Sequence, residues 1–394
     1  MVNIETPAYI VNEAILNKNI VYFKKALDNY FKRNILGYSL KTNSLPYVLK
    51  RVRHYGGYAE VVSHDEYELA RLCGFEPSEI IYNGPLKSKH TFLEAIQAGG
   101  IVNIECFREI EWLKELDLEK SYKVGVRVNI DLGLISPVDA KENEDYSRFG
   151  FSVESGEFLK VIKLLKLLPN IVIDCLHVHR TTLSRSVNVF KEIANYVISI
   201  IKDYELYSLT KLDIGGGYYG IMENKPTYLD YCKAIYDGLR SEIDLDIFTI
   251  IVEPGNAIVA SSIDFITSVI DVKKIRNFYV CTTDGSRNDI DPFYKKKDYF
   301  KQIVYCSEQE TVEKQIITGG TCLEYDKIFE LKDSSVLSMG DRIIYKSVGA
   351  YTMALSPLFI RFFPKVYLLE NEEYSVIRNH WSAEDFYSIY NTTK

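Results

Sequence analysis

The sequence predicts an α/β protein built as a (β/α)8 barrel followed by an all-β C-terminal domain. Between about residues 33 and 257, short runs rich in β-branched residues alternate with amphipathic segments, the pattern of repeated β-α units. About eight such runs occupy roughly 220 residues, a count that favours a closed barrel over an open dinucleotide-binding sheet. Beyond residue 262 only short strand-like runs follow. We therefore expect a barrel at residues 12–262 and a β domain at residues 263–394, which a strand within residues 1–11 joins.

The individual elements follow from local patterns. Strands are predicted where short runs of strand-forming residues are bounded by polar or glycine residues. Helices are predicted where apolar residues recur at helical spacing, and Gly74 and Gly99 mark two helix ends because glycine commonly follows the last helical residue. A long polar loop at 131–148 lies on the side where barrel enzymes place function. The barrel strands are expected at 34–42, 58–63, 80–83, 101–105, 122–130, 171–179, 211–215 and 248–253, the helices at 45–54, 65–73, 90–97, 107–116, 157–168, 189–203 and 228–243, and the later strands at 265–275, 278–282, 302–306, 315–318, 342–346 and 366–369.

The composition excludes several classes of protein. The formal charge is −7 and the pI is near 5.6, without a Lys/Arg cluster, so we expect a small-molecule partner and neither nucleic acid nor membrane. No apolar stretch approaches the roughly 18 residues of a membrane span and no signal peptide is visible, so the predicted location is cytoplasmic. Seven scattered cysteines without a Cys-x-x-Cys spacing argue against a disulfide framework and a zinc ribbon. No metal is expected, although His177 and His179 could be core imidazoles or a pair of metal ligands.

Polar residues gather at the predicted carboxyl ends of the barrel strands, which face the active site in this fold. One such residue means little because strand ends meet solvent, but their convergence indicates a site. The set comprises Lys41, Glu60, Asn83, Glu105, Arg127, Asn129, His177, His179, the turn 213–217 and the segment Glu253-Pro254-Gly255.

The glycine turn Gly215-Gly216-Gly217 predicts an anion site. Glycines let backbone N–H groups approach a phosphate closely, and barrels commonly bind phosphate after the seventh strand. Residues 215–220 also match G-x-G-x-x-G formally, which leaves a dinucleotide-binding dehydrogenase as an alternative. We favour it less, because Pro226 and polar residues follow instead of an immediate helix, and the motif comes late in the chain.

A phosphate site, a strand-end lysine and a strand-end carboxylate are what pyridoxal phosphate requires: an amine for a Schiff base, an anchor, and a partner for the ring nitrogen. The segment 38–43, Tyr-Ser-Leu-Lys-Thr-Asn, resembles the cofactor-lysine motif of the pyridoxal-phosphate decarboxylases acting on ornithine, arginine and diaminopimelate. The resemblance continues in order along nearly the whole chain, at Glu60-Val61-Val62-Ser63, Ser147-Arg148-Phe149-Gly150, His177-Val178-His179, Gly215-Gly216-Gly217, Glu253-Pro254-Gly255, Asp284-Gly285, Cys322 and Gly349-Ala350-Tyr351-Thr352.

This resemblance implies a barrel plus β domain and assigns roles to individual residues. Lys41 would link to the cofactor, His179 would stack on its ring, and Glu253 would pair with the pyridine nitrogen. A carboxylate there keeps the ring an electron acceptor when CO2 leaves, so Glu253 favours decarboxylation. Cys322 would serve the active site of the second subunit of a homodimer, as a proton donor. The other implied cofactor contacts are Glu60, Arg127, Thr182, Gly215, Gly216, Gly217, Gly255, Asn256 and Tyr351.

Several positions depart from the family pattern. Arg180-Thr181-Thr182 stands where the family has a Gly-Ser pair, and Asn256 replaces a common arginine near the phosphate. At the positions that would read the distal end of a substrate, Leu323 replaces an acidic residue, with Glu324 one place later, and Asp291 replaces the arginine of diaminopimelate decarboxylases. We therefore expect an unusual amino-acid substrate from a specialised biosynthetic pathway, larger than the standard ones or carrier-linked.

Two further functions remain open at this point. An amino-acid racemase can use a similar barrel, but such racemases usually place an arginine against the pyridine nitrogen, where this chain has Glu253. A catalytically inactive regulatory relative of the same fold is the non-enzyme alternative, and retention of Lys41, Glu253 and Cys322 counts against it.

Overall fold

The computed structural model describes residues 4–140, 147–180, 182, 184–307 and 310–390. Two compact units divide the chain. One spans Lys18–Ile258, and the other combines the residues up to Asn17 with those from Val259 onward. The second unit is therefore built from both ends of the chain.

The unit Lys18–Ile258 is a closed barrel, as the sequence predicts. Among the described residues, eight parallel strands follow one another in the order β5-β4-β3-β2-β10-β9-β8-β6, and pairing of β5 with β6 closes the ring. A short strand β7 (Phe151–Ser152) adds to β6. The ring consists of β2 (Asn34–Ser39), β3 (Tyr58–Ser63), β4 (Ile80–Leu86), β5 (Ile101–Ile104), β6 (Tyr122–Asn129), β8 (Ile171–Val178), β9 (Lys211–Asp213) and β10 (Thr249–Val252).

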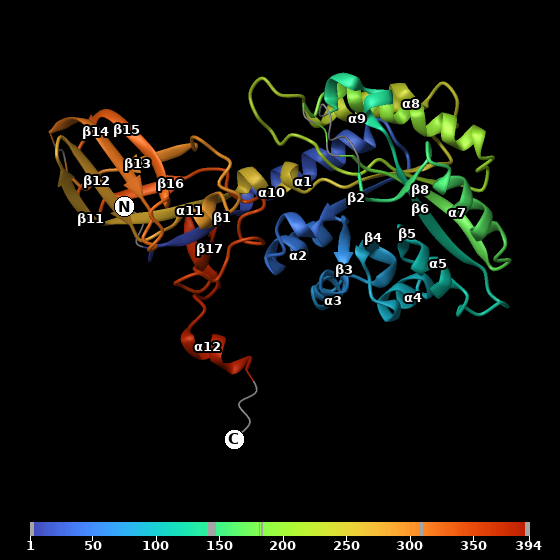
Figure 1. Ribbon diagram of the computed structural model, residues 1–394, viewed down its shortest axis with the longest axis horizontal. Coiled ribbons are helices and arrows are strands. Elements are labelled where there is room, and N and C mark those ends of the chain that lie inside the picture. Colours follow the sequence, from blue (N-terminus) through green and yellow to red (C-terminus); the bar gives the residue numbers. More distant parts are fainter. Residues whose placement is uncertain (1–3, 141–146, 181, 183, 308–309, 391–394) are drawn as a thin grey trace. The chain divides into compact units, whose positions relative to one another are not determined.

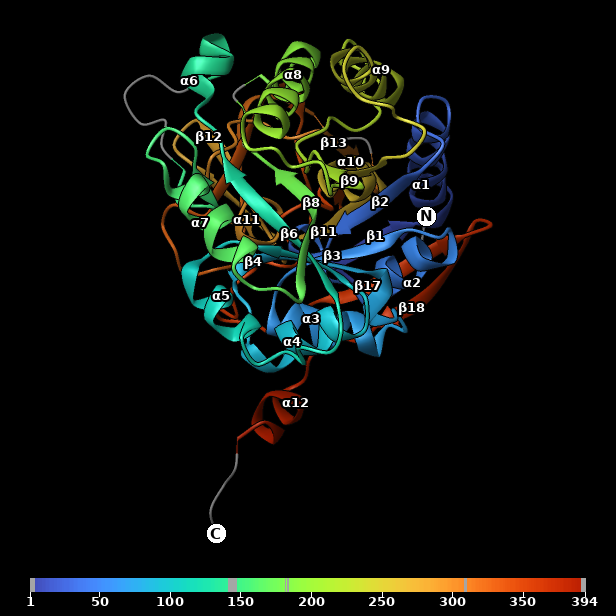
Figure 2. The same ribbon diagram turned by 90° about the vertical axis from the view of Figure 1, so that its right-hand side faces the viewer.

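Helices surround the barrel strands (Figure 2). The longest helix of the described residues, α8 (Val187–Asp203), buries an apolar face with helical spacing, and the Ser186 side chain caps it by accepting a hydrogen bond from the Val189 N–H. Gly74 ends α3 with a φ of +96°, a conformation that favours glycine. The other helices are α1 (Glu13–Asp28), which is not among the predicted elements, α2 (Pro46–His54), α3 (His64–Leu72), α4 (Lys89–Gln97), α5 (Phe107–Leu113), α7 (Glu157–Lys166) and α9 (Tyr228–Leu239).

The predicted loop 131–148 contains short helices in its described part. They are α6 (Leu132–Ile135) and the 3-10 turn η3 (Pro137–Asp139). The buried Asp139 carboxylate accepts hydrogen bonds from Ser136, Ser184 and Ser186, so it fastens this loop to the loop that follows β8.

The second unit is mostly β, also as predicted. In Figure 1 the blue N-terminal strand β1 (Ala8–Asn12) runs among orange and red strands from the C-terminal part, pairing antiparallel with β11 and parallel with β17. In the described part of the chain the sheet order is β15-β14-β12-β11-β1-β17-β18, with β16 pairing β11 and β13. The later strands are β11 (Ile263–Ile275), β12 (Phe278–Thr283), β13 (Lys301–Val304), β14 (Thr311–Thr318), β15 (Lys327–Ser335), β16 (Arg342–Tyr345), β17 (Lys365–Glu370) and β18 (Glu373–Arg378), accompanied by α11 (Arg287–Ile290) and α12 (Ala383–Ser388). The short helix α10 (Asn256–Val259) spans the boundary at which the barrel unit ends.

No helix among the described residues is both long and apolar enough to pass through a bilayer.

A fully buried ion pair supports the carboxyl ends of β4 and β5. Lys87 Nζ donates to the Gly84 carbonyl at 2.7 Å and lies 3.0 Å from Glu109 Oε1, and both charged side chains are completely shielded from solvent. Glu109 Oε2 accepts the Glu105 N–H at 2.7 Å. The pair therefore fixes the backbone at Glu105, one of the predicted strand-end residues.

Replacing Lys87 with methionine is expected to destabilise the protein strongly. The substitution leaves Glu109 buried without its counter-charge, and such losses lower the free energy of unfolding by about 3–5 kcal/mol. Urea unfolding of Lys87→Met measures the change. The matched control is Lys114→Met, because Lys114 forms an exposed pair with Glu111 at 2.6 Å, for which we expect a change below about 1 kcal/mol. Equal stability of the two variants would contradict the role of Lys87 as the buried counter-charge of Glu109.

Candidate active site

Lys41 and Glu60 form an ion pair at the carboxyl end of the barrel. Lys41 lies in a 3-10 turn, η1 (Leu40–Thr42), directly after β2, and Glu60 lies in the neighbouring strand β3. Lys41 Nζ is 2.8 Å from Glu60 Oε2, which also accepts a hydrogen bond from Ser39 Oγ at 2.6 Å. The Glu60 side chain is 1% exposed and that of Lys41 is 40% exposed. The Lys41 amine is thus paired with Glu60, while the Lys41 side chain remains partly exposed to solvent.

A second buried carboxylate, Glu253, follows β10 and connects to Glu60 through an amide. Asn83 Nδ2 donates to Glu253 Oε1 at 2.6 Å and to Glu60 Oε1 at 3.1 Å. Asn103 Nδ2 in turn donates to Asn83 Oδ1 at 2.7 Å. Residues from β3, β4, β5 and the end of β10 therefore share one polar network inside the barrel.

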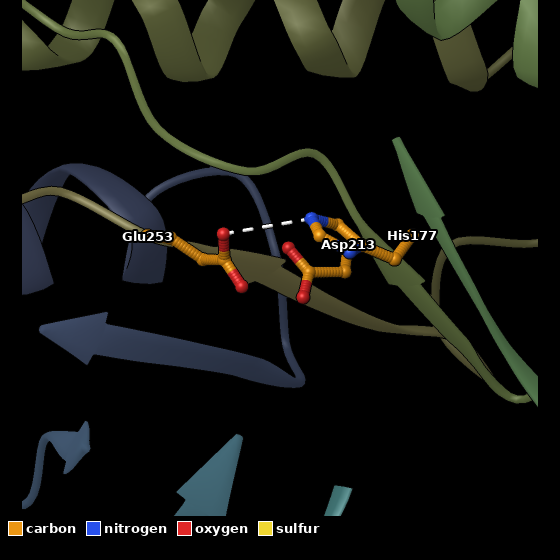
Figure 3. A group of neighbouring side chains, drawn as sticks. All are labelled: His177, Asp213 and Glu253. Carbon is orange, nitrogen blue, oxygen red and sulfur yellow. Dashed lines mark ion pairs between the residues drawn. The ribbon is translucent and has the colours of Figure 1, made fainter. Parts of the chain in front are cut away.

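His177, Asp213 and Glu253 form a buried cluster in which one nitrogen or oxygen atom of each side chain lies within 4.8 Å of the other two (Figure 3). His177 Nε2 is 3.6 Å from Glu253 Oε2. Burial, reinforced by the neighbouring Glu253 carboxylate, raises the pKa of Asp213 well above its ordinary value. Burial also opposes ionisation of Glu253, but His177 and Lys41 outweigh it and hold the pKa of Glu253 below its usual range. The surroundings therefore favour ionisation of Glu253 and oppose that of Asp213. The ligand types of the cluster also suit a divalent cation, which is the alternative use of these atoms.

His179 is fixed as a neutral ring beside the glycine turn. The Gly216 N–H donates to His179 Nδ1 at 3.1 Å, so the imidazole carries its hydrogen on Nε2. Burial, followed by the nearby Arg127 charge, lowers the pKa of His179 to about 3. A flat uncharged ring is suited to stacking on an aromatic ligand.

Two glycines of the turn, Gly215 and Gly216, pack too closely for any side chain. Gly215 has a φ of +69°, and a Cβ there would lie 2.6 Å from the His179 Cβ. A Cβ on Gly216 would lie 2.4 Å from the Glu253 carbonyl oxygen, and one on Gly255 would lie 2.0 Å from Thr42 Oγ1. The turn 215–217 and the segment 253–255 are therefore packed backbone against side chain around the predicted lysine.

Arg127 reaches the site from β6. Its Nη1 is 2.7 Å from Glu105 Oε1, both side chains are almost fully buried, and the guanidinium lies 4.8 Å from the centre of the Phe149 ring. Glu105 is in turn held through its backbone by Glu109. Arg127 is the buried cation of the site, whereas Asn256 is half-buried at the start of α10.

Thr182 is engaged in a local turn. Its Oγ1 accepts the Arg185 N–H at 3.1 Å, and the residue is half-buried. The preceding residue, Thr181, lies outside the described residues. A contact of Thr182 with phosphate stays a prediction.

The remaining predicted site residues belong to the other unit. Cys322 and Glu324 are exposed and Leu323 is half-buried, in the turn between β14 and β15, and Tyr351 is 39% exposed with a φ of +56°. The Arg287 N–H donates to Asp326 Oδ1 at 2.9 Å, which places this turn beside the Asp291 loop. The roles predicted for these residues stay predictions.

The Asp291 carboxylate makes its hydrogen bonds within its own loop. Its side chain accepts hydrogen bonds from the Arg287 guanidinium, from the backbone N–H groups of Lys295 and Lys296, and from the Tyr299 hydroxyl, at 2.9–3.2 Å. It is 5% exposed. The predicted substrate contact of Asp291 stays a prediction, and in this structure its oxygens hold the loop that surrounds them.

Glu66 is a titratable residue of this region that the sequence prediction missed. It lies in the first turn of α3, where Ser63-x-x-Glu66 has the form of a capping box, so its sequence signal was structural. Glu66 Oε2 accepts the Val62 N–H at 2.8 Å. Burial, with a smaller contribution from the Glu60 charge, raises its pKa to about 7.

Replacing Glu66 with glutamine is expected to stabilise the protein at pH 8 and not at pH 4. A carboxyl whose pKa rises on folding from 4.5 to about 7 contributes stability fully below pH 4.5 and loses it as the pH rises through 7. Glutamine removes that loss, so the free energy of unfolding should rise by about 1–3 kcal/mol at pH 8. Urea unfolding at both values checks this, with the exposed Glu68→Gln as control; an equal change at both pH values would contradict it.

Comparisons with known proteins agree with this geometry. Residues 15–260 match the family model described as pyridoxal-dependent decarboxylase, pyridoxal binding domain. The chain is 27% identical over 401 residues to diaminopimelate decarboxylase of Helicobacter pylori strain J99, covering 98% of this chain and 95% of that enzyme. It is 27% identical over 400 residues to a probable chloroplastic diaminopimelate decarboxylase of Oryza sativa subsp. japonica, covering 98% of this chain and 79% of that protein.

Solved structures share the fold. The structure of Helicobacter pylori diaminopimelate decarboxylase complexed with L-lysine matches with a TM-score of 0.81 and 26% identity, covering 98% of this chain and 97% of that one. The arginine decarboxylase of Paramecium bursaria Chlorella virus matches with a TM-score of 0.76 and 20% identity, covering 92% and 96% of the two chains. The second likeness concerns the fold alone.

Proposed function

Because this chain belongs to the family of pyridoxal-dependent decarboxylases, we propose that it removes the α-carboxylate of an amino acid that is neither ornithine nor diaminopimelate. The family makes it a carbon–carbon lyase with pyridoxal phosphate as cofactor. The observation that carries the proposal is the joint burial of Glu60 and Glu253 beside the accessible amine of Lys41.

The barrel residues fit this cofactor. Lys41 offers the amine, and the glycines at 215 and 216 let the backbone of the turn lie directly against His179 and Glu253. Polar atoms at the strand ends are buried and make no hydrogen bond within the described part of the chain, which is unusual in a protein interior and suits a polar ligand. They are Thr42 Oγ1, Glu105 Oε2, Arg127 Nε and His177 Nδ1.

We assign the following roles within the barrel. Lys41 would bind the cofactor covalently, the backbone of residues 215–217 would bind its phosphate, and the neutral ring of His179 would lie against the pyridine. When bound, pyridoxal phosphate supplies a ring that accepts the electrons left by the departing carboxylate. The ionised Glu253 would hold a proton on the pyridine nitrogen, and Glu60 holds the ammonium form of Lys41 by their ion pair.

Residues of the other unit would complete the site in a homodimer. We propose that Cys322 supplies the proton that replaces CO2, serving the site of the second subunit, and that Leu323 and Glu324 face the distal end of the substrate. Tyr351 would contact phosphate. Asp291 is assigned to holding its loop, in keeping with its saturated carboxylate.

The substrate class follows from those distal residues. The named relatives are diaminopimelate decarboxylases. At the position where the family places an acidic residue this chain has the apolar Leu323, with Glu324 one place later, and the Asp291 carboxylate already holds its own loop. Neither a distal ammonium nor a distal carboxylate therefore meets its partner at the usual position. We therefore propose a larger or carrier-linked amino acid as substrate.

One experiment tests cofactor and substrate in order. The purified protein is incubated with pyridoxal phosphate, its visible spectrum is recorded, and the modified lysine is located by peptide mass after borohydride reduction. CO2 release is then measured across ornithine, arginine, diaminopimelate and side-chain-acylated amino acids. An adduct on Lys41 with release from an acylated substrate supports the proposal. A colourless, unmodified protein would overturn the decarboxylase and favour the regulatory relative, and rapid turnover of ornithine or diaminopimelate would overturn the substrate class.

A further inference from the structure

Asn83 joins two buried carboxylates that come from barrel strands that are not direct neighbours. It is on β4, which is separated from β10 by β3 and β2 in the strand order. Its single amide nitrogen nevertheless donates to both Glu60 Oε1, at 3.1 Å, and Glu253 Oε1, at 2.6 Å. The three residues are 1–5% exposed, so water cannot substitute for the amide.

The orientation of this amide is fixed. Asn103 Nδ2 donates to Asn83 Oδ1 at 2.7 Å, which turns the Asn83 NH2 group toward the carboxylates. Asn103 cannot move aside easily, because it packs against Gly125, where a Cβ would lie 1.8 Å from Asn103 Oδ1. A flipped Asn83 would instead set its oxygen against two carboxylates.

The neutral amide of Asn83 lowers the free-energy cost of burying two carboxylates close together. Two buried carboxylates repel each other, and each is costly to ionise inside the barrel. An amide hydrogen bond favours the ionised form of both without adding charge. Glu60 also accepts hydrogen bonds from Ser39 and Lys41. For Glu253, the Asn83 amide nitrogen at 2.6 Å lies much closer than the His177 imidazole nitrogen at 3.6 Å.

We propose that Asn83 is a positioning residue that fixes Glu253 for the ring nitrogen of the cofactor and links it to the Lys41–Glu60 pair. The proposal rests on the function proposed above for the same site. Asn83 acts through Glu253, and no contact of its own with the cofactor is required. The titratable groups that face the Glu253 carboxyl are Lys41, Glu60, Cys175, His177, His179, Asp213 and Tyr218.

Two substitutions test it. Asn83→Leu removes the donor at similar volume, and Asn83→Asp keeps the shape while placing a third carboxyl between the other two. Both should raise the pH at which Glu253 ionises, so the acid limb of kcat against pH should move upward by about one pH unit. We expect kcat to fall by about 10- to 100-fold, and KM to change little, because Asn83 is not placed against the substrate.

The matched control is Asn170→Leu. Asn170 is also a buried asparagine, and its Nδ2 donates to the backbone oxygens of Leu116 and Asp117. This variant is expected to lose stability while keeping the parental pH profile and the parental spectrum of bound pyridoxal phosphate. If Asn83→Leu does not fold, Asn83→Asp carries the comparison, since the two side chains have nearly the same size.

A readout without cofactor separates this inference from the proposed function. Urea unfolding of the cofactor-free protein is measured from pH 4 to 8. Because the pKa of Glu253 is held below its usual range in the folded protein, this group contributes stability at neutral pH that is lost as the pH falls. In both Asn83 variants that pKa rises toward its unfolded value, so they should be less stable than the wild type at pH 8 and should lose less stability on acidification. Parental pH dependence in this measurement, together with a parental acid limb, would overturn the inference. If the wild type neither binds pyridoxal phosphate nor releases CO2, the proposed function fails, while the cofactor-free titration still decides whether Asn83 controls Glu253.

Discussion

Replacing Lys41 with alanine is expected to lower kcat/KM for decarboxylation by on the order of 10⁴-fold and to abolish borohydride-stable labelling of the protein. Lys41 is the accessible amine of the site, and its partner Glu60 is fully buried. The fold should survive the substitution, because Glu60 keeps hydrogen bonds from Ser39 and Asn83. The variant therefore separates loss of chemistry from loss of structure.

The measurement combines initial rates with intact-protein mass after reduction in the presence of pyridoxal phosphate. Lys89→Ala is the control, because Lys89 forms an exposed ion pair with Glu115 and is not among the predicted site residues. It should label and turn over like the wild type. Labelling of Lys41→Ala at another lysine, with retained activity, would show that the assignment of the cofactor lysine is wrong.

Replacing Glu253 with glutamine is expected to lower kcat by about 100- to 1,000-fold with little change in KM. Glutamine keeps the size of the side chain and can still accept the Asn83 hydrogen bond, but it cannot hold a proton on the ring nitrogen. It also removes the negative charge beside Asp213, so the raised pKa of Asp213 should fall toward its ordinary range. The expected fall in kcat is therefore due to the lost negative charge and not to a change in packing.

Steady-state rates and the visible spectrum of the bound cofactor check this result, with the exposed Glu111→Gln as control. The same assay discriminates the metal use of the His177, Asp213 and Glu253 cluster. Decarboxylation through pyridoxal phosphate should be unaffected by a chelator. Activity that a chelator removes and a divalent cation restores would assign these three side chains to a metal.

The repeating part of the fold was predictable because its signals are local. The run 58–63 is the strand β3, and Gly74 ends α3 where expected. Each barrel strand has its own apolar run, so counting runs predicts the closed barrel. The placement of Lys41 and Glu253 at strand ends then follows from the barrel itself.

Elements without a local pattern were missed. β7 has two residues, too few for any periodicity, and β15 is a long strand with many exposed polar residues, which hides its alternation. The strand β18 is short and mostly outside the core. Such strands are specified by their neighbours in the sheet rather than by their own residues.

Within the site, the sequence predicted which residues gather but not how they share partners. Asn83 was expected at a strand end, yet its contact with Glu253 depends on closure of the barrel across β3 and β2. Glu66 carried the signature of a helix cap, which says nothing about its burial. Asp291 occupies a position associated with substrate in the family, and only the structure reveals the donors that surround it.

The pairing of β2 with β10 also has a consequence for biosynthesis. It brings Asn34 opposite Ile250, so the ring cannot close until nearly all of the barrel has been translated. Lys41 precedes Glu253 by roughly 210 residues, which corresponds to about 10–40 s of elongation at typical rates. The β2 edge therefore has no β10 partner until that strand has been translated, and we expect the proposed cofactor site to form only after Glu253 has emerged, so that cofactor loading would be a late event in maturation.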